Sequence, residues 1–281
     1  MTTSSKSIWK LDSGAWSRKD DQLAVEEPLE IRIAYGQGAD RRQESLSVTM
    51  RTPGNDPELA IGFLFTEGII GSAADILSTR FVGTQWEGDM QYNSLLVELA
   101  PGLSFDPGKL SRHFYTASSC GVCGKGSIEL VRTQTCFFPI ARRPVVAAST
   151  LFAFPDRLRN AQPLFSCTGG IHAAGLFDRE GALLLLREDV GRHNALDKLV
   201  GAALREGRIP LRDQALMVSG RASFELVQKA LMAGIPILIA VGAPSSLAVD
   251  LAEEYGMTLV GFLRENSFNV YTGEHRILMD E

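Results

Sequence analysis

Residues 215–241 decide the fold class, and they read ALMVSGRASFELVQKALMAGIPILIAV. A short apolar run (215–218) leads into a segment with helical periodicity (222–233), which stops at Gly234 before a second apolar run (235–241). The same alternation continues through other apolar runs and helical segments, at residues 182–186, 192–205, 246–255 and 258–262. Strands that alternate with helices over short links predict an α/β unit, built on a parallel sheet with right-handed crossovers.

This alternation also predicts a binding edge, because ligands of open α/β sheets bind beyond the carboxyl ends of the strands. The links at that edge combine small or hydroxyl residues with arginines and helix starts, at residues 187–194, 219–223, 242–246 and 264–266. Free N–H groups at helix starts and arginine side chains suit phosphate. Alternatively, the serines only cap helices; these are Ser219, Ser223, Ser245 and Ser246. Neither a Walker A motif nor G-x-G-x-x-G occurs, which argues against an ordinary P-loop or Rossmann site.

The first half of the chain predicts a mixed α+β region. Alternating patterns at 29–34 and 46–50 indicate a hairpin around turn residues 36–40. Asp56, expected as an N-cap, precedes Pro57 and a helix that continues through residue 65, and short strands follow at 81–82 and 95–99. Residues 1–27 are interpreted as a polar tail. One domain is expected over 28–281, with its α+β part extending to about residue 160 and its β-α part following.

A reactive loop is predicted at residues 118–126, SSCGVCGKG. Small residues leave the thiols of Cys120 and Cys123 uncovered, and the ammonium of Lys125 favours thiolate. The C-x-x-C spacing alone fits half a zinc site, a redox pair, a nucleophile with a neighbouring thiol, or two buried small residues. A second stretch of small residues, 165–174, holds Cys167 and His172, and burial as ordinary core residues is the favoured interpretation of both.

Composition limits the class of function. The chain has 281 residues with ordinary charged and apolar content and a net charge of −5, which argues against broad binding to nucleic acids or anionic membranes. It has no secretory signal and no apolar run of about 18 residues, so no membrane span and a cytoplasmic location are expected. Thiols stay reduced in that compartment, so an exposed C-x-x-C favours chemistry or metal binding over a structural disulfide.

Seven segments together resemble one family, FdhD/NarQ, whose members are sulfur carriers needed for formate dehydrogenase activity. The matching segments are EEPL (26–29), TMRTPG (49–54), GFLFTEGII (62–70), SSCGVCGK (118–125), TGGIHAA (168–174), REDVGRHNA (187–195) and SGRASFE (219–225). The resemblance implies a fold related to cytidine deaminases, a homodimer and a sulfurtransferase activity with a persulfide on Cys120, which Cys123 assists or shares. A cysteine desulfurase would supply the sulfur.

The same resemblance implies the substrate that receives the sulfur. It is the molybdenum or tungsten of a bis-molybdopterin guanine dinucleotide, before insertion into formate dehydrogenase, and GDP or GMP would mimic it. The family's cofactor-contact segment corresponds to Phe262, Leu263, Arg264, Glu265, Asn266 and Ser267. This segment coincides with the binding edge predicted from the strand order. Further candidates at that edge are Arg192, Arg221 and Ser219, with His193 and His172 for proton transfer; no resident metal is expected.

Other functions stay open at this stage. A cofactor chaperone without covalent chemistry would make the C-x-x-C structural or zinc-binding. A deaminase is disfavoured, because Ala173 and Ala174 follow His172 without the required glutamate, and no proline precedes Cys120. A thiol–disulfide oxidoreductase is disfavoured because no thioredoxin-like pattern surrounds the C-x-x-C.

Overall fold

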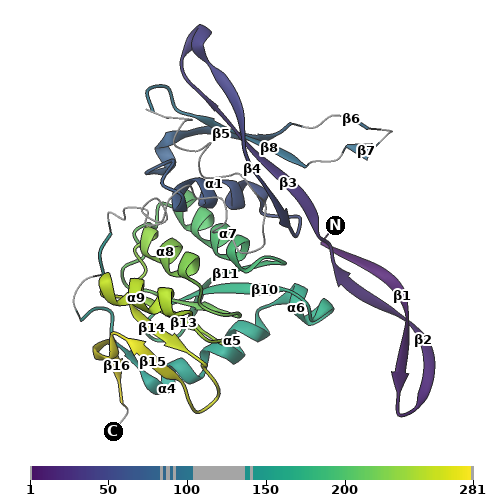
Figure 1. The fold of residues 1–281 in the computed structure, drawn as a ribbon, viewed down its shortest axis with the longest axis vertical. Coiled ribbons are helices and arrows are strands. Elements are labelled where there is room, and N and C mark those ends of the chain that lie inside the picture. The colour runs from purple at the N-terminus through teal and green to yellow at the C-terminus, as the bar shows by residue number, and fades with distance from the viewer. Residues whose placement is uncertain are drawn as a thin grey trace.

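Two β-sheets, with helices between them and beside the second sheet, make up the body of the protein (Figure 1). This computed structural model describes residues 2–82, 85–86, 89–90, 93–103, 137–139 and 142–279. The arrangement is an α/β fold, in agreement with the sequence prediction. The relation to cytidine deaminases and the domain boundaries near residues 28 and 160 stay predictions.

The first sheet has four strands in the order β4-β3-β8-β5. They are β3 (Glu27–Tyr35), β4 (Arg42–Arg51), β5 (Ile76–Phe81) and β8 (Ser94–Leu99). The predicted hairpin is confirmed, because β3 pairs antiparallel with β4. Alternate residues Leu29, Ile31 and Ile33 are buried, whereas Glu30 and Arg32 are partly exposed, so this sheet turns one face to the core.

The second sheet has six strands in the order β11-β10-β12-β13-β14-β15. They are β10 (His172–Phe177), β11 (Leu183–Asp189), β12 (Ala215–Val218), β13 (Ile237–Ala240), β14 (Thr258–Gly261) and β15 (Asn269–Thr272). The prediction of a parallel sheet is wrong in part. Only β12, β13 and β14 pair in parallel; β10 is antiparallel to both its neighbours, and β15 is antiparallel to β14.

The inserted strand β10 keeps the predicted edge intact. Because β10 runs opposite to both β11 and β12, those two strands point the same way. The carboxyl ends of β11, β12, β13 and β14 therefore lie along one edge, and the start of β10, at His172, joins them there.

Helices fill the space between the sheets and cover the far face of the second sheet. The longer ones are α1 (Asp56–Thr66), α7 (Arg192–Arg205), α8 (Phe224–Met232) and α9 (Ser246–Glu254). The predicted bounds agree within two residues at most ends. The N-cap of α1 is Asn55, however, and Asp56 is the first helical residue, because its carboxylate binds Arg51 instead of capping the helix.

The remaining elements are short. They are α4 (Ala148–Phe152), α5 (Phe154–Asn160), α6 (Pro163–Thr168), η1 (Gly38–Asp40), η2 (Ala73–Asp75), η3 (Glu274–Arg276), β6 (Gln85–Trp86), β7 (Asp89–Met90), β9 (Val146–Ala147) and β16 (Ile277–Leu278). No helix of the described residues combines the length and apolarity that crossing a bilayer requires.

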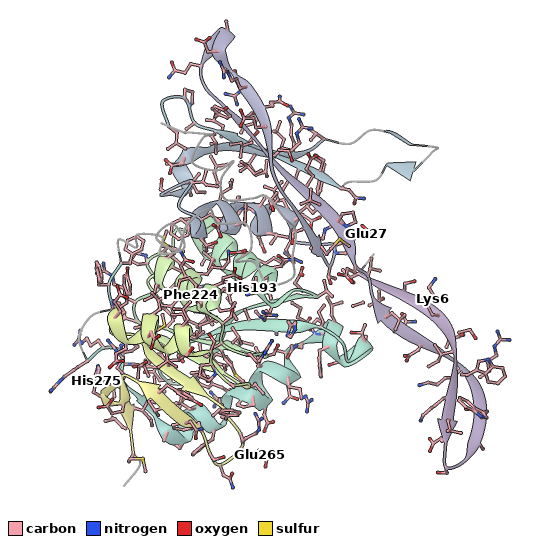
Figure 2. All side chains as sticks on the ribbon, viewed as in Figure 1. Lys6, Glu27, His193, Phe224, Glu265 and His275 are labelled. Atoms are coloured by element: carbon pink, nitrogen blue, oxygen red, sulfur yellow. The ribbon has the colours of Figure 1, made fainter. Side chains whose placement is uncertain are left out.

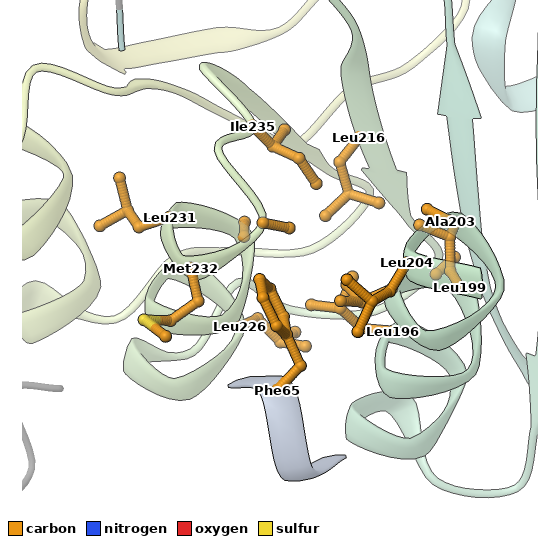
Figure 3. Packing of buried hydrophobic residues seen from close by; sticks show 14 of the residues in the cluster. Phe65, Leu196, Leu199, Ala203, Leu204, Leu216, Leu226, Leu231, Met232 and Ile235 are labelled. Atoms are coloured by element: carbon orange, nitrogen blue, oxygen red, sulfur yellow. The ribbon is translucent and has the colours of Figure 1, made fainter. Parts of the chain in front are cut away.

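The central strands β12, β13 and β14 of the second sheet are buried on both faces. Leu216 and Val218 of β12 belong to the large core shared with α1, α7 and α8, whereas Ala215 and Met217 belong to a smaller core that also contains Phe154. Figure 3 shows Phe65 of α1 among leucines of α7 and α8 in the large core. Burial on both faces explains why these strands are continuous apolar runs without polar alternation.

The segment expected as a polar tail is a long β-hairpin, which we call the arm. Its strands are β1 (Thr3–Asp12) and β2 (Ala15–Ala24), and they pair antiparallel in a sheet of their own. The arm projects from the body in Figure 1. Trp9 and Trp16 do not dock on the body, since 64% and 66% of their surfaces are exposed.

Two glycines let α1 and α7 approach backbone to backbone. A Cβ at Gly62 would overlap the Asp197 carbonyl oxygen and stand 2.8 Å from the Gly201 nitrogen, and a Cβ at Gly201 would overlap the Glu58 carbonyl oxygen. The opposing atoms are backbone, which cannot rotate away. Arg187 of β11 reinforces this contact, because its Nη2 donates to Glu58 Oε1 at 2.9 Å.

We therefore expect Gly62→Ala to lower the free energy of unfolding by about 3 kcal/mol, because the added methyl group must push the two helices apart. The measurement is chemical denaturation. Gly71→Ala is the matched control, since the nearest atom to its Cβ would be the Asp75 Oδ2, at 3.7 Å. Equal stability of the two variants would contradict the role assigned to the helix contact.

Candidate functional site

Polar side chains collect where β11, β12, β13 and β14 end and β10 begins. We call this surface the polar edge, and it comprises His172, Asp189, Arg192, Ser219, Gly220, Arg221, Gly242, Phe262 and Arg264. Backbone hydrogen bonds join its loops in the order of the strands: the Gly242 N–H donates to the Gly220 carbonyl at 2.9 Å, and the Phe262 N–H donates to the Gly242 carbonyl at 3.2 Å. Residues distant in sequence thus form one continuous surface.

His172 and Ser219 meet at the centre of the polar edge. The Ser219 hydroxyl accepts the Ala173 N–H at 2.9 Å and lies 3.4 Å from His172 Nδ1. Burial lowers the pKa of His172, and the nearby Arg192 guanidinium lowers it further, against the opposing effect of Asp189. The imidazole is therefore neutral near pH 7 and can accept a proton.

Arg192 lies beside this pair, at the first position of α7. Its Cδ would be 3.7 Å from a Cβ at Gly220, and the His172 ring would be 3.4 Å from the same point, so both side chains flank Gly220. The Arg192 Nε is buried without a hydrogen-bond partner among the described residues. Burying a donor without a partner costs free energy, so the Arg192 Nε suits a ligand that offers an acceptor oxygen.

Asp189 fixes the loop that carries Arg192. Its carboxylate is fully buried, forms an ion pair with Lys198 at 2.7 Å, and accepts the Gly191 N–H at 2.8 Å and the Thr52 N–H at 3.1 Å. Lys198 also donates to the Thr52 carbonyl at 2.8 Å. The pair therefore ties the polar edge to the loop that follows β4.

His193 faces inward and is held by two oxygens. Its Nε2 lies 3.1 Å from both Ser223 Oγ and Glu225 Oε2. Burial lowers the pKa of His193 to about 3, with further lowering from the charges of Arg192 and Lys229. The ring is neutral, so the Glu225 contact is a hydrogen bond and no ion pair. Because a carboxylate only accepts, the proton is assigned to Nε2, and Nδ1 is left as an acceptor.

A buried charge cluster lies behind His193. The Lys229 ammonium donates to Asp197 Oδ1 at 2.9 Å and to Thr66 Oγ1 at 2.9 Å, and it lies 3.5 Å from Glu67. Burial alone would lower the pKa of Lys229, but the carboxylates of Asp197 and Glu67 outweigh it and raise the pKa. Lys229 thus stays charged and joins α8 to α7 and α1.

Three arginines at the polar edge have no carboxylate partner among the described residues: Arg192, Arg221 and Arg264. Arg221 packs over Gly242, whose added Cβ would stand 2.9 Å from Arg221 Cγ. Arg264 Nη1 donates only to backbone carbonyls, those of Val241 at 2.8 Å and Leu263 at 2.9 Å. Cationic groups without a paired carboxylate favour an anionic ligand.

The predicted cofactor-contact segment is exposed except at one position. Phe262 is 40% exposed and has a positive φ of 56°, a conformation that bulky residues seldom adopt. Leu263 is buried in the smaller core, so its side chain does not face the surface. Glu265, Asn266 and Ser267 are exposed. Figure 2 shows Glu265 at the lower end of the molecule and His193 near its middle, so the segment extends the edge away from the histidines.

The serines at the helix starts divide into two groups. Ser245 is a helix cap, because its side chain accepts the Ala248 N–H at 3.3 Å. Ser219 and Ser223 contact the imidazoles of His172 and His193 instead, and Ser223 makes no capping bond with its side chain. Capping therefore does not account for the serines nearest the histidines.

Cys120 and Cys123 lie outside the described residues, so their nucleophile and carrier roles stay predictions. Cys167 is exposed on α6. The Glu188 carboxylate holds the start of this helix, because it accepts the N–H of Leu164 at 3.0 Å and the N–H of Phe165 at 2.9 Å.

The sequence model of the FdhD/NarQ family matches residues 24–278. The chain belongs to this family. It is 55% identical over 278 residues to the sulfur carrier protein FdhD of Mycolicibacterium paratuberculosis, with 99% of each chain covered. It is also 41% identical to the sulfur carrier protein FdhD of Sulfurisphaera tokodaii, over 96% of this chain and 97% of the relative.

The fold is likewise that of an FdhD/NarQ relative. A crystal structure of a putative formate dehydrogenase accessory protein from Desulfotalea psychrophila superposes with a TM-score of 0.74. It is 26% identical in sequence, and the match covers 99% of this chain and 100% of that one.

Two groups at this FdhD/NarQ site were not singled out from the sequence. Glu225, which holds His193, lies within the segment SGRASFE (219–225), but nothing in that segment indicates the contact. Lys229 and Asp197 were not distinguished from the other residues of their helices, although they interrupt the apolar faces of α8 and α7. Charged residues inside an apolar helical stripe were the signal that could have identified them.

His193 is predicted to stay neutral down to a pH of about 4, because its burial opposes protonation. Its folded pKa lies below the unfolded value of about 6.5, so its contribution to stability is lost as the pH falls from about 6.5 toward 3. The measurement is an NMR titration of labelled histidines, with His193 assigned through His193→Asn. A titration midpoint near the unfolded value would contradict the burial argument.

Proposed function

We propose that this protein is a sulfurtransferase that loads sulfane sulfur from a cysteine desulfurase onto Cys120 and passes it to a bis-molybdopterin guanine dinucleotide. The observation that carries the proposal is the C-x-x-C of residues 120–123 in a chain that belongs to the FdhD/NarQ family, whose relatives are named sulfur carrier proteins. The coarser role, in the maturation of formate dehydrogenase, follows from the accessory protein with the same fold.

Loading is an exchange between thiolate and persulfide. The Cys120 thiolate attacks the outer sulfur of the desulfurase persulfide, a new S–S bond forms on Cys120, and the desulfurase cysteine leaves as thiolate. No external oxidant or reductant is needed, because one S–S bond replaces another. Lys125 supports this step by favouring the thiolate form of the nearby cysteines.

Delivery of the sulfur as sulfide requires two electrons, and Cys123 is placed in sequence to supply them. Its thiolate attacks the Cys120 sulfur, the outer sulfur leaves as hydrosulfide, and a Cys120–Cys123 disulfide forms. A cellular dithiol then reduces this disulfide. The proposal therefore assigns the protein to a compartment that keeps thiols reduced, such as the cytoplasm.

The polar edge is the proposed binding surface for the dinucleotide substrate. Arg192, Arg221 and Arg264 would hold its phosphates, since none of them pairs with a carboxylate among the described residues. Ser219 would add a hydroxyl, and Phe262 offers an exposed aromatic side chain. His172 is the proposed proton acceptor, because its neutral imidazole lies at the centre of the polar edge. His193 is also neutral, but it faces inward and its pKa of about 3 makes it a weaker base.

The mass of the intact protein tests the loading step. After incubation with an active desulfurase and cysteine, the wild type is expected to gain about 32 Da per sulfur, reversed by a reductant, because the product is a persulfide. Cys120→Ala should gain nothing. Cys123→Ala should load normally but release little hydrosulfide when a thiol-free acceptor is supplied, since its second thiolate is missing.

Cys167→Ala is the matched control for these variants, because that thiol is exposed but lies outside the C-x-x-C. Normal loading of Cys120→Ala would overturn the assignment of the nucleophile. Absence of loading in every protein, together with stoichiometric zinc, would favour the alternative of a non-covalent cofactor chaperone with a metal-binding C-x-x-C.

GDP binding tests the substrate surface separately. Arg192→Ala is expected to weaken GDP binding by about tenfold or more, because a charge-assisted hydrogen bond to a phosphate is lost. Isothermal titration calorimetry measures the effect. Arg179→Ala is the control, because Arg179 is an exposed arginine paired with Glu180 in the turn between β10 and β11. Equal affinities of both variants would exclude Arg192 from the nucleotide site.

A further inference from the structure

Two neighbouring helices begin at the polar edge, and each start carries an arginine. Helix α7 begins at Arg192, and the loop before α8 carries Arg221. The Arg192 Cδ would be 3.7 Å from a Cβ at Gly220, and Arg221 follows Gly220 in the chain. Neither arginine pairs with a carboxylate among the described residues. The surface between them therefore suits an anion that two cations can share.

The two helix starts are tied to different parts of the molecule. The loop ahead of Arg192 is fixed by the buried carboxylate of Asp189, which accepts a backbone N–H of that loop at 2.8 Å. The loop with Arg221 is fixed by the next loop along the sheet, because the Ala222 N–H donates to the Ala243 carbonyl at 3.2 Å. The separation of the two cations thus depends on what joins these starts to each other.

His193, the second residue of α7, provides that connection. Its Nε2 lies 3.1 Å from Ser223 Oγ and 3.1 Å from Glu225 Oε2, both at the start of α8. Figure 2 labels His193 close to Phe224, the first residue of α8. Ser223 occupies the N-cap without making a capping bond through its side chain. A hydroxyl that leaves its usual capping role and a carboxylate that is only 12% exposed thus contact the same imidazole.

We propose that Glu225, through His193, sets the separation of Arg192 and Arg221, and that this separation makes the polar edge selective for a diphosphate over a monophosphate. Glu225 is a positioning residue, because its carboxylate contacts His193 and not the ligand. The inference rests on the proposed nucleotide surface, since it concerns the spacing of the cations on that surface.

The selectivity follows from the geometry of the ligand. The two phosphates of a diphosphate are joined through one oxygen, so two cations can bind both only if their separation matches. Cations that are already held at that separation bind without the cost of ordering them. A monophosphate needs one cation, and its affinity is therefore insensitive to the spacing.

Isothermal titration calorimetry with GDP and GMP tests this inference. The wild type is expected to bind GDP at least about tenfold more tightly than GMP, because the second phosphate adds a charge-assisted hydrogen bond. Glu225→Ala should lower this ratio to about threefold or less, while the affinity for GMP changes by less than about twofold, since one cation still holds a single phosphate. A general loss of structure would instead weaken both nucleotides together.

Glu225→Gln separates geometry from charge. Its amide oxygen still accepts the Nε2 proton of His193 although the negative charge is gone, so the ratio should stay within about twofold of the wild type. Glu44→Ala is the matched control, because Glu44 is a partly buried carboxylate that accepts the Tyr35 hydroxyl at 2.6 Å on the first sheet. The control should keep the ratio of the wild type.

Ser223→Ala is a second test of the same contact, and its loss leaves no buried charge. It removes the other oxygen that holds His193, so it should lower the ratio in the same direction. The inference is overturned if the wild type binds GDP and GMP equally, if Glu225→Ala or Ser223→Ala keeps the ratio, or if Glu225→Ala and Glu225→Gln lose it alike. A wild type that binds neither nucleotide would refute the nucleotide surface itself, and this inference with it.

Discussion

The contact between α1 and α7 sets how the two layers of the protein meet. Gly62 and Gly201 remove the two Cβ atoms that would keep the helices apart, so α1 and α7, which lie between the two sheets, meet through backbone contact. Polar groups reinforce the contact at both ends, through Arg187 with Glu58 and through Thr66 with Asp197. Because α7 begins at Arg192, the same packing sets where the polar edge presents its central cation.

Buried charges connect that edge to the core. Asp189 and Lys198 pair beneath the loop that carries Arg192, and His193 reaches Glu225, next to the cluster around Lys229. A buried pair contributes little net stability compared with apolar residues, but removing one partner is costly. These residues therefore hold side chains in defined positions. Arg192, Arg221 and Arg264, by contrast, pair with no carboxylate among the described residues and stay available to an anion.

The sequence predicted elements well where periodicity and helix ends agreed. The helix at 192–205 and the strand at 215–218 match because apolar spacing and flanking glycines mark them. Strand β10 was missed, because His172-Ala173-Ala174-Gly175 has small residues and no alternation, as a strand buried on both faces allows. The arm was missed because its polar strands bury nothing. The polar edge was predicted correctly although the strand pairing was not. Because β10 is antiparallel to both β11 and β12, those two strands still point the same way. Leu263 was assigned to the site, but its side chain points into the core.

The helices α1 and α7 lie far apart along the chain, and this separation affects how the protein folds during its synthesis. Thr66 and Asp197, which bond across them, are 131 residues apart. The face of α1 that packs on α7 cannot be covered until α7 has left the ribosome. Contacts of such long range slow folding and leave apolar surface open in the meantime. The nascent chain therefore carries an uncovered apolar helix face while the residues between α1 and α7 are synthesised.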